Sequence, residues 1–367
     1  MLPACHSKAH ISGTLLRAPI RPDNTTLEKT SLRATPRREA ISPRIRSIMG
    51  VLSLPFFFIL AIAIPAHAAK YAGDPFSLGV GGRSLGLGGA TVAGPFDASA
   101  PYWNPAGMLS LDGQYVLAMH AETFGSLLNH DFVSYVDANP HDSSLVRAWG
   151  VYLYYLGGGG IKITQLDQYN RPYVVKEESH GDYLLAGSVA GRLSEKADFG
   201  LSGKIIYRDI GTETGIGLTI DAGGIYRIHP KATLGLKVND ITTGFIRYSG
   251  KTFGTGGNTE SIYPTVRPSI MIHHQYHDFT GRLLFTGDVK FESLKQSAQL
   301  WVGSLSMDTH YGFEINWREM AFGRVGFDIG RLTLGAGAAV RNFTLDLAYL
   351  HDADFDATFR VSGGYRW

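Results

Sequence analysis

Two short stretches of the sequence contain residue types that could bind a metal or a phosphate. His273, His274 and His277 lie close together, and imidazole nitrogens are common metal ligands. On a strand, His274 faces away from the other two, and those two have no obvious carboxylate partner, which favours a structural role. Residues 79–89, GVGGRSLGLGG, are as rich in glycine as a phosphate-binding loop. However, no strand precedes them, and they lack both the Gly-x-Gly-x-x-Gly spacing and a Gly-Lys-Ser/Thr ending.

No catalytic group of residues is evident in the sequence. It contains no Gly-x-Ser-x-Gly elbow, and neither a Ser-His-Asp arrangement nor a pair of carboxylates can be argued. The single cysteine, Cys5, lies far from the body of the chain, which excludes disulfides and cysteine metal sites there. We therefore expect no enzyme and no bound cofactor or metal; a lipase-like enzyme built into a barrel is the alternative.

The chain begins with a basic leader and an apolar run. Residues 51–68, VLSLPFFFILAIAIPAHA, end in an Ala-x-Ala site and follow Arg44 and Arg46, which predicts a secretory signal peptide cleaved after Ala68. A single membrane anchor is the alternative, but the run is short for a span. The leader before Met49 is explained by an over-extended gene start or, less simply, by a transit peptide.

Removing the leader changes the charge of the protein. Residues 1–48 contain nine of the 34 Lys and Arg and three of the 32 Asp and Glu. The mature chain then has 34 − 9 = 25 basic and 32 − 3 = 29 acidic residues, a net charge of about −4. This balance does not support a nucleic-acid partner.

The body of the chain alternates between apolar and polar residues. In YGFEINW, Tyr311, Phe313, Ile315 and Trp317 are apolar and alternate with residues such as Glu314. This period of two predicts strands, but it fits both a soluble sandwich and a membrane barrel, whose apolar face points to lipid. Segments of about nine to thirteen residues, aromatic residues near their ends and the signal peptide favour the barrel.

The expected strands give a rough count for this barrel. Fifteen segments are recognised, but because both ends of a single-chain barrel share one side, one segment is over-split and about fourteen strands are expected. Two long connections, residues 157–181 and 240–263, are expected on one side, and GGGGIKITQLDQ in the first is interpreted as a flexible extracellular loop. The fifteen segments are 114–121, 129–137, 145–156, 182–193, 197–209, 215–228, 231–239, 264–277, 281–292, 297–305, 309–317, 320–328, 331–340, 343–351 and 355–367.

The chain ends on an alternating strand with a terminal aromatic residue, FRVSGGYRW. Phe359, Val361, Tyr365 and Trp367 fall on one face of this strand. Such an ending resembles the signal by which bacterial outer-membrane barrels reach their assembly machinery. We interpret Phe359, Tyr365 and Trp367 as that signal; an ordinary last strand is the alternative.

The N-terminal part of the mature chain resembles the PorV/PorQ family, a branch of the FadL-like outer-membrane barrels. The resemblance rests on GVGGRSLGLGGA (79–90), DASA (97–100) and YWNPAG (102–107). It continues through GLSGKIIYRDIG, DAGGIYRIHPKATLGLKVNDI and TLGAGAAVRNFTLDLAYL, and thus covers most of the mature chain.

The resemblance implies three parts of the chain: a leader and signal peptide (1–68), an N-terminal hatch that plugs the lumen (69–112), and an outer-membrane β-barrel (113–367). Pro105 favours an extended Asn104, and Asp97 and Asn104 can bond loop amides. The residues expected to form the gate in the hatch are Arg83, Asp97, Asn104, Pro105 and Ala106. The lumen-facing charges expected to pair with one another, or with Arg83 and Asp97, are Lys204, Arg208, Asp221, Lys237, Asp288, Lys290, Glu314 and Arg324.

Two functions follow from the resemblance. The first is uptake or binding of small hydrophobic compounds, such as fatty acids or hydrocarbons, in the bacterial outer membrane. The second is a PorV-like role in type IX secretion, in which the barrel binds secreted protein cargo at the cell surface. A barrel with a purely structural role is a third. In each case the expected partners are outer-membrane lipids and the barrel assembly machinery.

Overall fold

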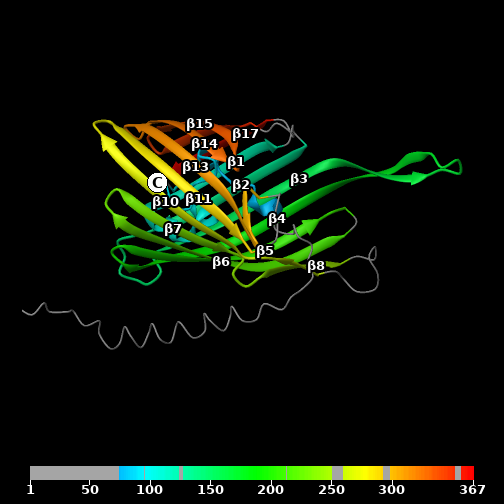
Figure 1. Cartoon of the computed structure of the whole chain (residues 1–367), viewed down its shortest axis with the longest axis horizontal. Helices are drawn as coiled ribbons and strands as arrows, with labels where there is room; N and C mark the ends of the chain where they lie inside the picture. Colours follow the sequence, from blue (N-terminus) through cyan, green and yellow to red (C-terminus); the bar gives the residue numbers. More distant parts are fainter. Residues whose placement is uncertain are drawn as a thin grey trace, which may run out of the picture. The chain divides into compact units, whose positions relative to one another are not determined.

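The described part of the chain forms a closed antiparallel β-barrel of fourteen wall strands around an irregular N-terminal segment (Figure 1). The computed structural model describes residues 74–94, 96–123, 127–211, 213–249, 259–291, 298–351 and 357–367. The predicted leader and signal peptide, residues 1–68, lie outside the described residues. The predicted fold class is confirmed.

Each wall strand pairs with its neighbours in sequence, and the last strand pairs with the first. Residues Glu122 and Phe359 are partners at one end of this closing pair, and Tyr115 and Arg366 at the other. The wall strands are β1 (Gly113–Thr123), β2 (Leu128–Ala138), β3 (Ala148–Leu166), β4 (Pro172–Ser194), β5 (Ala197–Asp209), β6 (Thr214–His229), β7 (Ala232–Asn239), β10 (Thr265–Tyr276), β11 (Phe279–Lys290), β13 (Leu305–Trp317), β14 (Ala321–Asp328), β15 (Arg331–Val340), β16 (Phe343–Leu350) and β17 (Thr358–Arg366).

Three further short strands lie at the ends of wall strands. β8 (Gly244–Ser249) and β9 (Thr259–Ile262) form a hairpin on the end of β6, within the expected long connection 240–263. β12 (Leu300–Val302) folds back on the start of β13. The expected strand 297–305 is therefore wrong, because β11 pairs directly with β13 and leaves no place for it in the wall.

A two-stranded arm, residues 158–180, extends from the wall between β3 and β4. β2 pairs with β3 as far as Gly157, and β5 pairs with β4 from Gly181 onward, whereas β3 and β4 stay paired out to Leu166 and Pro172. Figure 1 shows this pair reaching past the other strands. The interpretation of this region as a flexible loop is wrong, because four consecutive glycines obscured the strand pattern beyond them.

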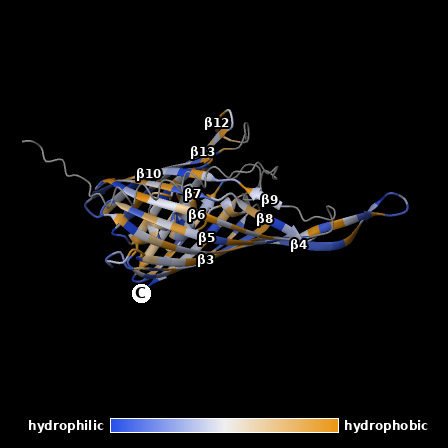
Figure 2. Ribbon diagram, turned by 90° about the horizontal axis from the view of Figure 1, so that it is seen from below, coloured by the Kyte–Doolittle hydropathy of each residue, from blue (hydrophilic) through white to orange (hydrophobic). Residues whose placement is uncertain are grey.

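The alternation along the wall strands is that of a membrane barrel. On β13, Tyr311, Phe313, Ile315 and Trp317 are between 42% and 47% exposed, whereas Glu314 is completely buried. Figure 2 shows hydrophobic and hydrophilic residues alternating along the wall and a hydrophilic tip on the arm. Apolar side chains therefore face outward and polar ones face the lumen. Within the described residues, no helix is long and apolar enough to cross a membrane.

The described part of the hatch begins at Asp74 and leads into β1. It is irregular apart from four short helical turns, each of which Gly and Pro limit to four to six residues. Most of its residues are buried inside the barrel. The turns are η1 (Asp74–Ser77), α2 (Gly82–Gly86), α3 (Ala100–Trp103) and η2 (Pro105–Ser110).

Candidate functional site

One end of the hatch is fixed to the wall by buried charges. Arg83 on α2 donates through Nε and Nη2 to the two carboxylate oxygens of Glu314, at 3.0 and 2.9 Å. Arg282 and Arg324 also donate to Glu314, at 2.6 and 2.7 Å, and Arg324 donates to Asp346 at 2.6 Å. Burial lowers the pKa of Arg83, but the Glu314 carboxylate outweighs burial and the net pKa is raised, so the guanidinium stays charged. The expected pairing of Arg83 and Arg324 with Glu314 is thus present.

The Asn104-Pro105-Ala106 stretch lies against the wall at β5 and β6. Asn104 is extended (φ −163°, ψ 108°), as the following proline predicts, and its Nδ2 donates to the carbonyls of Val92 (2.9 Å) and Gly224 (3.2 Å). The Asn104 Oδ1 accepts from the Ala106 backbone N–H at 3.2 Å. One side chain therefore joins two parts of the hatch to the wall.

Wall glycines allow this close approach. A Cβ on Gly200 would lie 2.4 Å from the Ala106 nitrogen, and one on Gly223 would lie 2.1 Å from Asn104 Oδ1. Both distances are far shorter than a van der Waals contact. Gly203, also on β5, has nothing within 4 Å of its Cβ position. The fit of hatch to wall therefore depends on particular glycines.

Asp97 organises the hatch rather than pairing with the wall charges. Its Oδ1 accepts from the Ser99 backbone N–H (2.8 Å) and hydroxyl (2.5 Å), just before α3. Beside it, the Ala98 carbonyl accepts from the Ser134 hydroxyl of β2 at 2.6 Å. Ala98 thus contacts the wall through a neutral hydrogen bond.

The aromatic pair Tyr102-Trp103 holds the start of the hatch. The Tyr102 hydroxyl donates to the Phe76 carbonyl (2.8 Å) and accepts from Gly79 N–H (3.2 Å), and Trp103 Nε1 donates to the Val80 carbonyl (2.9 Å). Burial raises the pKa of Tyr102, so its hydroxyl keeps the proton that it donates.

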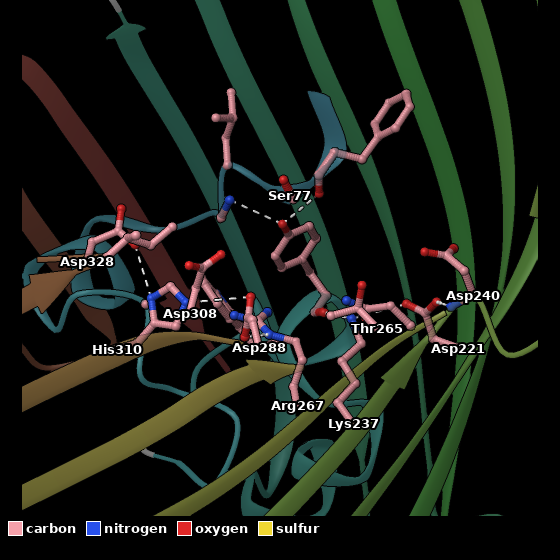
Figure 3. A pocket seen from close by; sticks show the side chains of 18 of the residues that line it. Ser77, Asp221, Lys237, Asp240, Thr265, Arg267, Asp288, Asp308, His310 and Asp328 are labelled. Atoms are coloured by element: carbon pink, nitrogen blue, oxygen red, sulfur yellow. Dashed lines mark hydrogen bonds and ion pairs between the residues drawn. The ribbon is translucent and has the colours of Figure 1, made fainter. Parts of the chain in front are cut away.

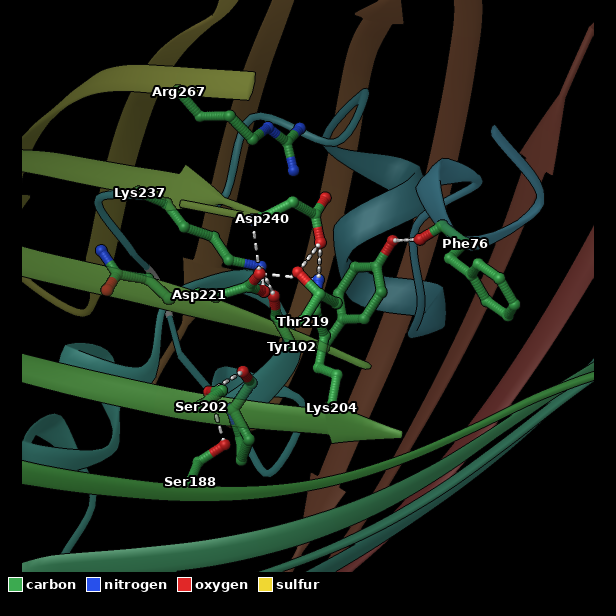
Figure 4. A network of polar contacts seen from close by, with 12 residues as sticks. Phe76, Tyr102, Ser188, Ser202, Lys204, Thr219, Asp221, Lys237, Asp240 and Arg267 are labelled. Atoms are coloured by element: carbon green, nitrogen blue, oxygen red, sulfur yellow. Dashed lines mark hydrogen bonds and ion pairs between the residues drawn. The ribbon is translucent and has the colours of Figure 1, made fainter. Parts of the chain in front are cut away.

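A network of lysines and aspartates lies next to Tyr102, on β5 and β6 and at the end of β7 (Figure 4). Lys204 Nζ contacts Asp221 (2.6 Å) and Asp240 (2.7 Å), and Lys237 Nζ contacts Asp221 (3.1 Å). Lys237 also donates to the Tyr102 carbonyl. The predicted pairing of lumen charges is present here, although Asp240 was not among the predicted residues.

A second network joins β10, β11, β13 and β14 (Figure 3). Arg267 donates to Asp288 at 2.6 Å, and His310 lies between Asp288 (3.5 Å) and Asp328 (3.0 Å). His310 Nδ1 also lies 2.9 Å from the Gly88 carbonyl of the hatch. The predictions missed His310, although the period of two on β13 places it on the same face as Glu314.

A cavity of about 320 Å³ lies between the hatch and the wall. Both networks line it, and so do the hatch aromatics Phe76, Tyr102 and Trp103. Many of its wall residues, such as Asn239 and Lys290, stand at the strand ends away from Trp367 and the start of β1. The lining of the cavity combines aromatic rings with positively and negatively charged side chains.

The predicted assembly-signal residues and the histidine cluster do not line this cavity. Phe359 is 62% exposed and Trp367 is 57% exposed, and the Trp367 ring packs 5.3 Å from the ring of Tyr365. His277 follows β10 in a turn, with φ 50°, so it does not share a strand face with His273 as predicted. Within the described residues, no group of three or more His, Cys, Asp or Glu is placed to hold a metal.

No family model matches the chain, and no curated protein matches it in sequence. A solved structure, the "CymD monoaromatic hydrocarbon channel", is similar with a TM-score of 0.52 and 13% identity, over 79% of this chain and 98% of that chain. The chain has the fold of that channel. The toluene transporter TodX of Pseudomonas putida (TM-score 0.47, 11% identity, 78% and 97% covered) and a FadL homologue of Pseudomonas aeruginosa (0.43, 12%, 77% and 97%) are also similar. The expected β-barrel fold is confirmed, and membership of the FadL-like class and of its PorV/PorQ branch stays a prediction.

The wall glycines generate a prediction about the hatch. Gly200→Ala should push Ala106 away from the wall, because overpacking of a buried contact costs about 1–3 kcal/mol. We expect the backbone amides around Ala106 to exchange with solvent roughly 5 to 160 times faster, as this energy range implies. Gly203→Ala on the same strand should leave the exchange rate unchanged. Equal exchange rates for the two variants would contradict the proposed contact.

Proposed function

We propose that this protein is an outer-membrane barrel that takes up small, largely hydrophobic compounds through a lumen closed by its hatch. The observation that supports this most is the pairing of a filled lumen with a ligand-sized cavity. Small-molecule sites usually measure about 300–1,000 Å³, and this cavity falls within that range.

We infer the class of compound from the CymD channel, which shares the fold and is described as a monoaromatic hydrocarbon channel. In this chain the rings of Phe76, Tyr102 and Trp103 line the cavity and offer apolar surface to a single-ring molecule.

The hatch divides into an anchor and a gate. The anchor is α2, where Arg83 is bound to Glu314; removing one partner of such a buried pair costs about 3–5 kcal/mol. The gate is residues 97–106, with Asp97, Asn104, Pro105 and Ala106. Its hydrogen bonds with Ser134, Ser202 and Gly224 are neutral and contribute about 1 kcal/mol each, and Tyr102 also accepts from Lys237 and packs against wall aromatics. We propose that the gate moves while the anchor holds the hatch in the lumen.

A reversible lock tests this function. Cysteines in place of Ala98 and Ser134, whose carbonyl and hydroxyl oxygens are 2.6 Å apart, would tie the gate to β2. The predicted mature chain has no other cysteine. We expect host cells carrying the oxidised variant to take up radiolabelled toluene no faster than cells without the protein, and reduction to restore uptake.

The two single-cysteine variants control for the substitutions themselves, and thiol titration checks that the disulfide forms. Equal toluene uptake by the oxidised and reduced double variant would reject the moving gate. Uptake that never exceeds that of empty cells would reject the transport function.

We also propose that Phe359, Tyr365 and Trp367 direct the chain to the barrel assembly machinery and hence to outer-membrane lipids. Phe359 and Tyr365 share a face of β17, which closes the barrel against β1, and the exposed Trp367 directly follows this strand. Trp367→Asp should lower the amount of folded barrel in the outer membrane several-fold. Tyr173→Asp on the arm, where the ring is 49% exposed, should not. Equal amounts on an unheated gel would argue against a terminal signal.

The arm favours a second candidate, the binding of secreted cargo. Among the described residues, no other strand pairs with the arm beyond Gly157 and Gly181, and Tyr173, Val174 and Val175 are each 49% exposed. Unpaired strand edges are templates for pairing with another chain.

Deletion of residues 159–180 separates the two candidates. If the arm binds cargo, secreted protein should move from the cell surface to the medium in this variant, while toluene uptake continues. Unchanged retention at the surface would remove the second candidate.

A further inference from the structure

Three buried polar side chains lie on the lumen face where the barrel closes. Ala121 of β1 pairs with Arg360 of β17 on one side and with His130 of β2 on the other, so Arg360 and His130 lie in one row. Thr123 stands two residues beyond Ala121 and therefore on the same face of β1. All three side chains are buried, at 3%, 0% and 5% exposure for Arg360, His130 and Thr123.

These side chains have unusually many polar atoms without a partner. Nε and Nη1 of Arg360, both ring nitrogens of His130 and the hydroxyl of Thr123 have no hydrogen-bond partner within the part of the chain that the structure describes. Arg360 Nη2 donates only to the Leu78 carbonyl, at 3.3 Å. Buried polar groups are normally hydrogen-bonded, so an orphaned cluster calls for an explanation.

Arg360 differs from the other cationic groups of the lumen. Arg83, Arg267 and Lys204 each contact a carboxylate within 3.0 Å, whereas no carboxylate of the described residues forms an ion pair with Arg360. A buried charge is costly unless it is paired. A bound anion would supply the partner that this guanidinium lacks.

Arg360 and Thr123 both line the cavity, and aromatic rings stand beside them. A Cβ on Gly79 would meet the Trp103 ring at 2.9 Å and Arg360 Nη1 at 3.9 Å, which places ring and guanidinium on the same side of the hatch backbone. The Phe76 ring packs against Tyr154, and the His130 ring lies 4.5 Å from the ring of Tyr154. An anionic group and an apolar ring can thus be accommodated together.

We infer that Arg360 and Thr123 form a subsite for the carboxylate of a small aromatic acid. A carboxylate matches the planar guanidinium fork, which offers Nε and Nη1, and it can also accept from the Thr123 hydroxyl. The aromatic body lies against the hatch rings. This inference rests on the proposed function and narrows its ligand class from hydrocarbons to acids with an apolar body.

The test compares benzoate with benzyl alcohol, which has the same ring and no charge. Calorimetric titration of the detergent-solubilised barrel should show benzoate binding at least tenfold more tightly than benzyl alcohol. Arg360→Met should lower benzoate affinity at least tenfold and change benzyl alcohol affinity less than twofold. Arg331→Met is the control, because Arg331 also lines the cavity but is ion-paired with Asp328; it should change benzoate affinity less than threefold.

Several results would overturn the subsite. One is unchanged benzoate binding in Arg360→Met, and another is equal affinity of the native protein for benzoate and benzyl alcohol. Displacement of benzoate by 0.2 M chloride, about physiological ionic strength, would show a general anion site instead. If Arg360→Met does not assemble, the isosteric Thr123→Val serves, with an expected loss of about fivefold for one hydrogen bond.

Failure of the subsite is distinguishable from failure of the transport function. Toluene uptake without preferential benzoate binding would remove the subsite and leave the channel. Benzoate binding that depends on Arg360, without toluene uptake, would retain the subsite and remove hydrocarbon transport.

Discussion

The rest of the interior depends on the ion pairs that the Glu314 carboxylate forms with three arginines. This carboxylate is completely buried and receives hydrogen bonds from Arg83 of the hatch and from Arg282 and Arg324 of the wall. Without Glu314, three guanidinium groups would lose their shared partner inside the barrel, where unpaired charge is costly. This pairing fixes α2 against β13 and so determines where the remainder of the hatch can lie.

Steric fit, in addition to the ion pairs of Arg83, positions the hatch against the wall. Beyond the anchor, the hatch backbone approaches the wall at glycines such as Gly200 and Gly223, and its polar groups find wall partners at Ser134 and Gly224. These hydrogen bonds are individually weak, and the buried Tyr102 adds contacts with Lys237 and with wall aromatics. A segment held by a buried ion-pair network at α2 and by separate smaller contacts along the rest can close a lumen and still move, which is what the proposed gate requires.

Features with local sequence patterns were predictable, and features set by distant partners were not. The alternation around Glu314 predicted a lumen-facing carboxylate, and Arg83 was expected to pair with one of several lumen charges, but the sequence did not specify which one. The arm escaped prediction because glycines 157–160 interrupt the strand pattern. The special position of Arg360 could not be predicted, because its neighbours depend on the register with which β17 closes on β1. The period of two alone could not show that Arg360, unlike Arg324, lacks a carboxylate.

The central claim is that the hatch closes the lumen. Single-channel conductance in planar bilayers tests it most directly, with intact protein compared with a variant that lacks residues 69–112. Fourteen strands enclose a lumen wide enough to conduct ions unless something fills it. The account predicts a closed intact barrel and regular open-channel steps from the truncated one. Steady conductance of the intact protein, unchanged by truncation, would contradict it.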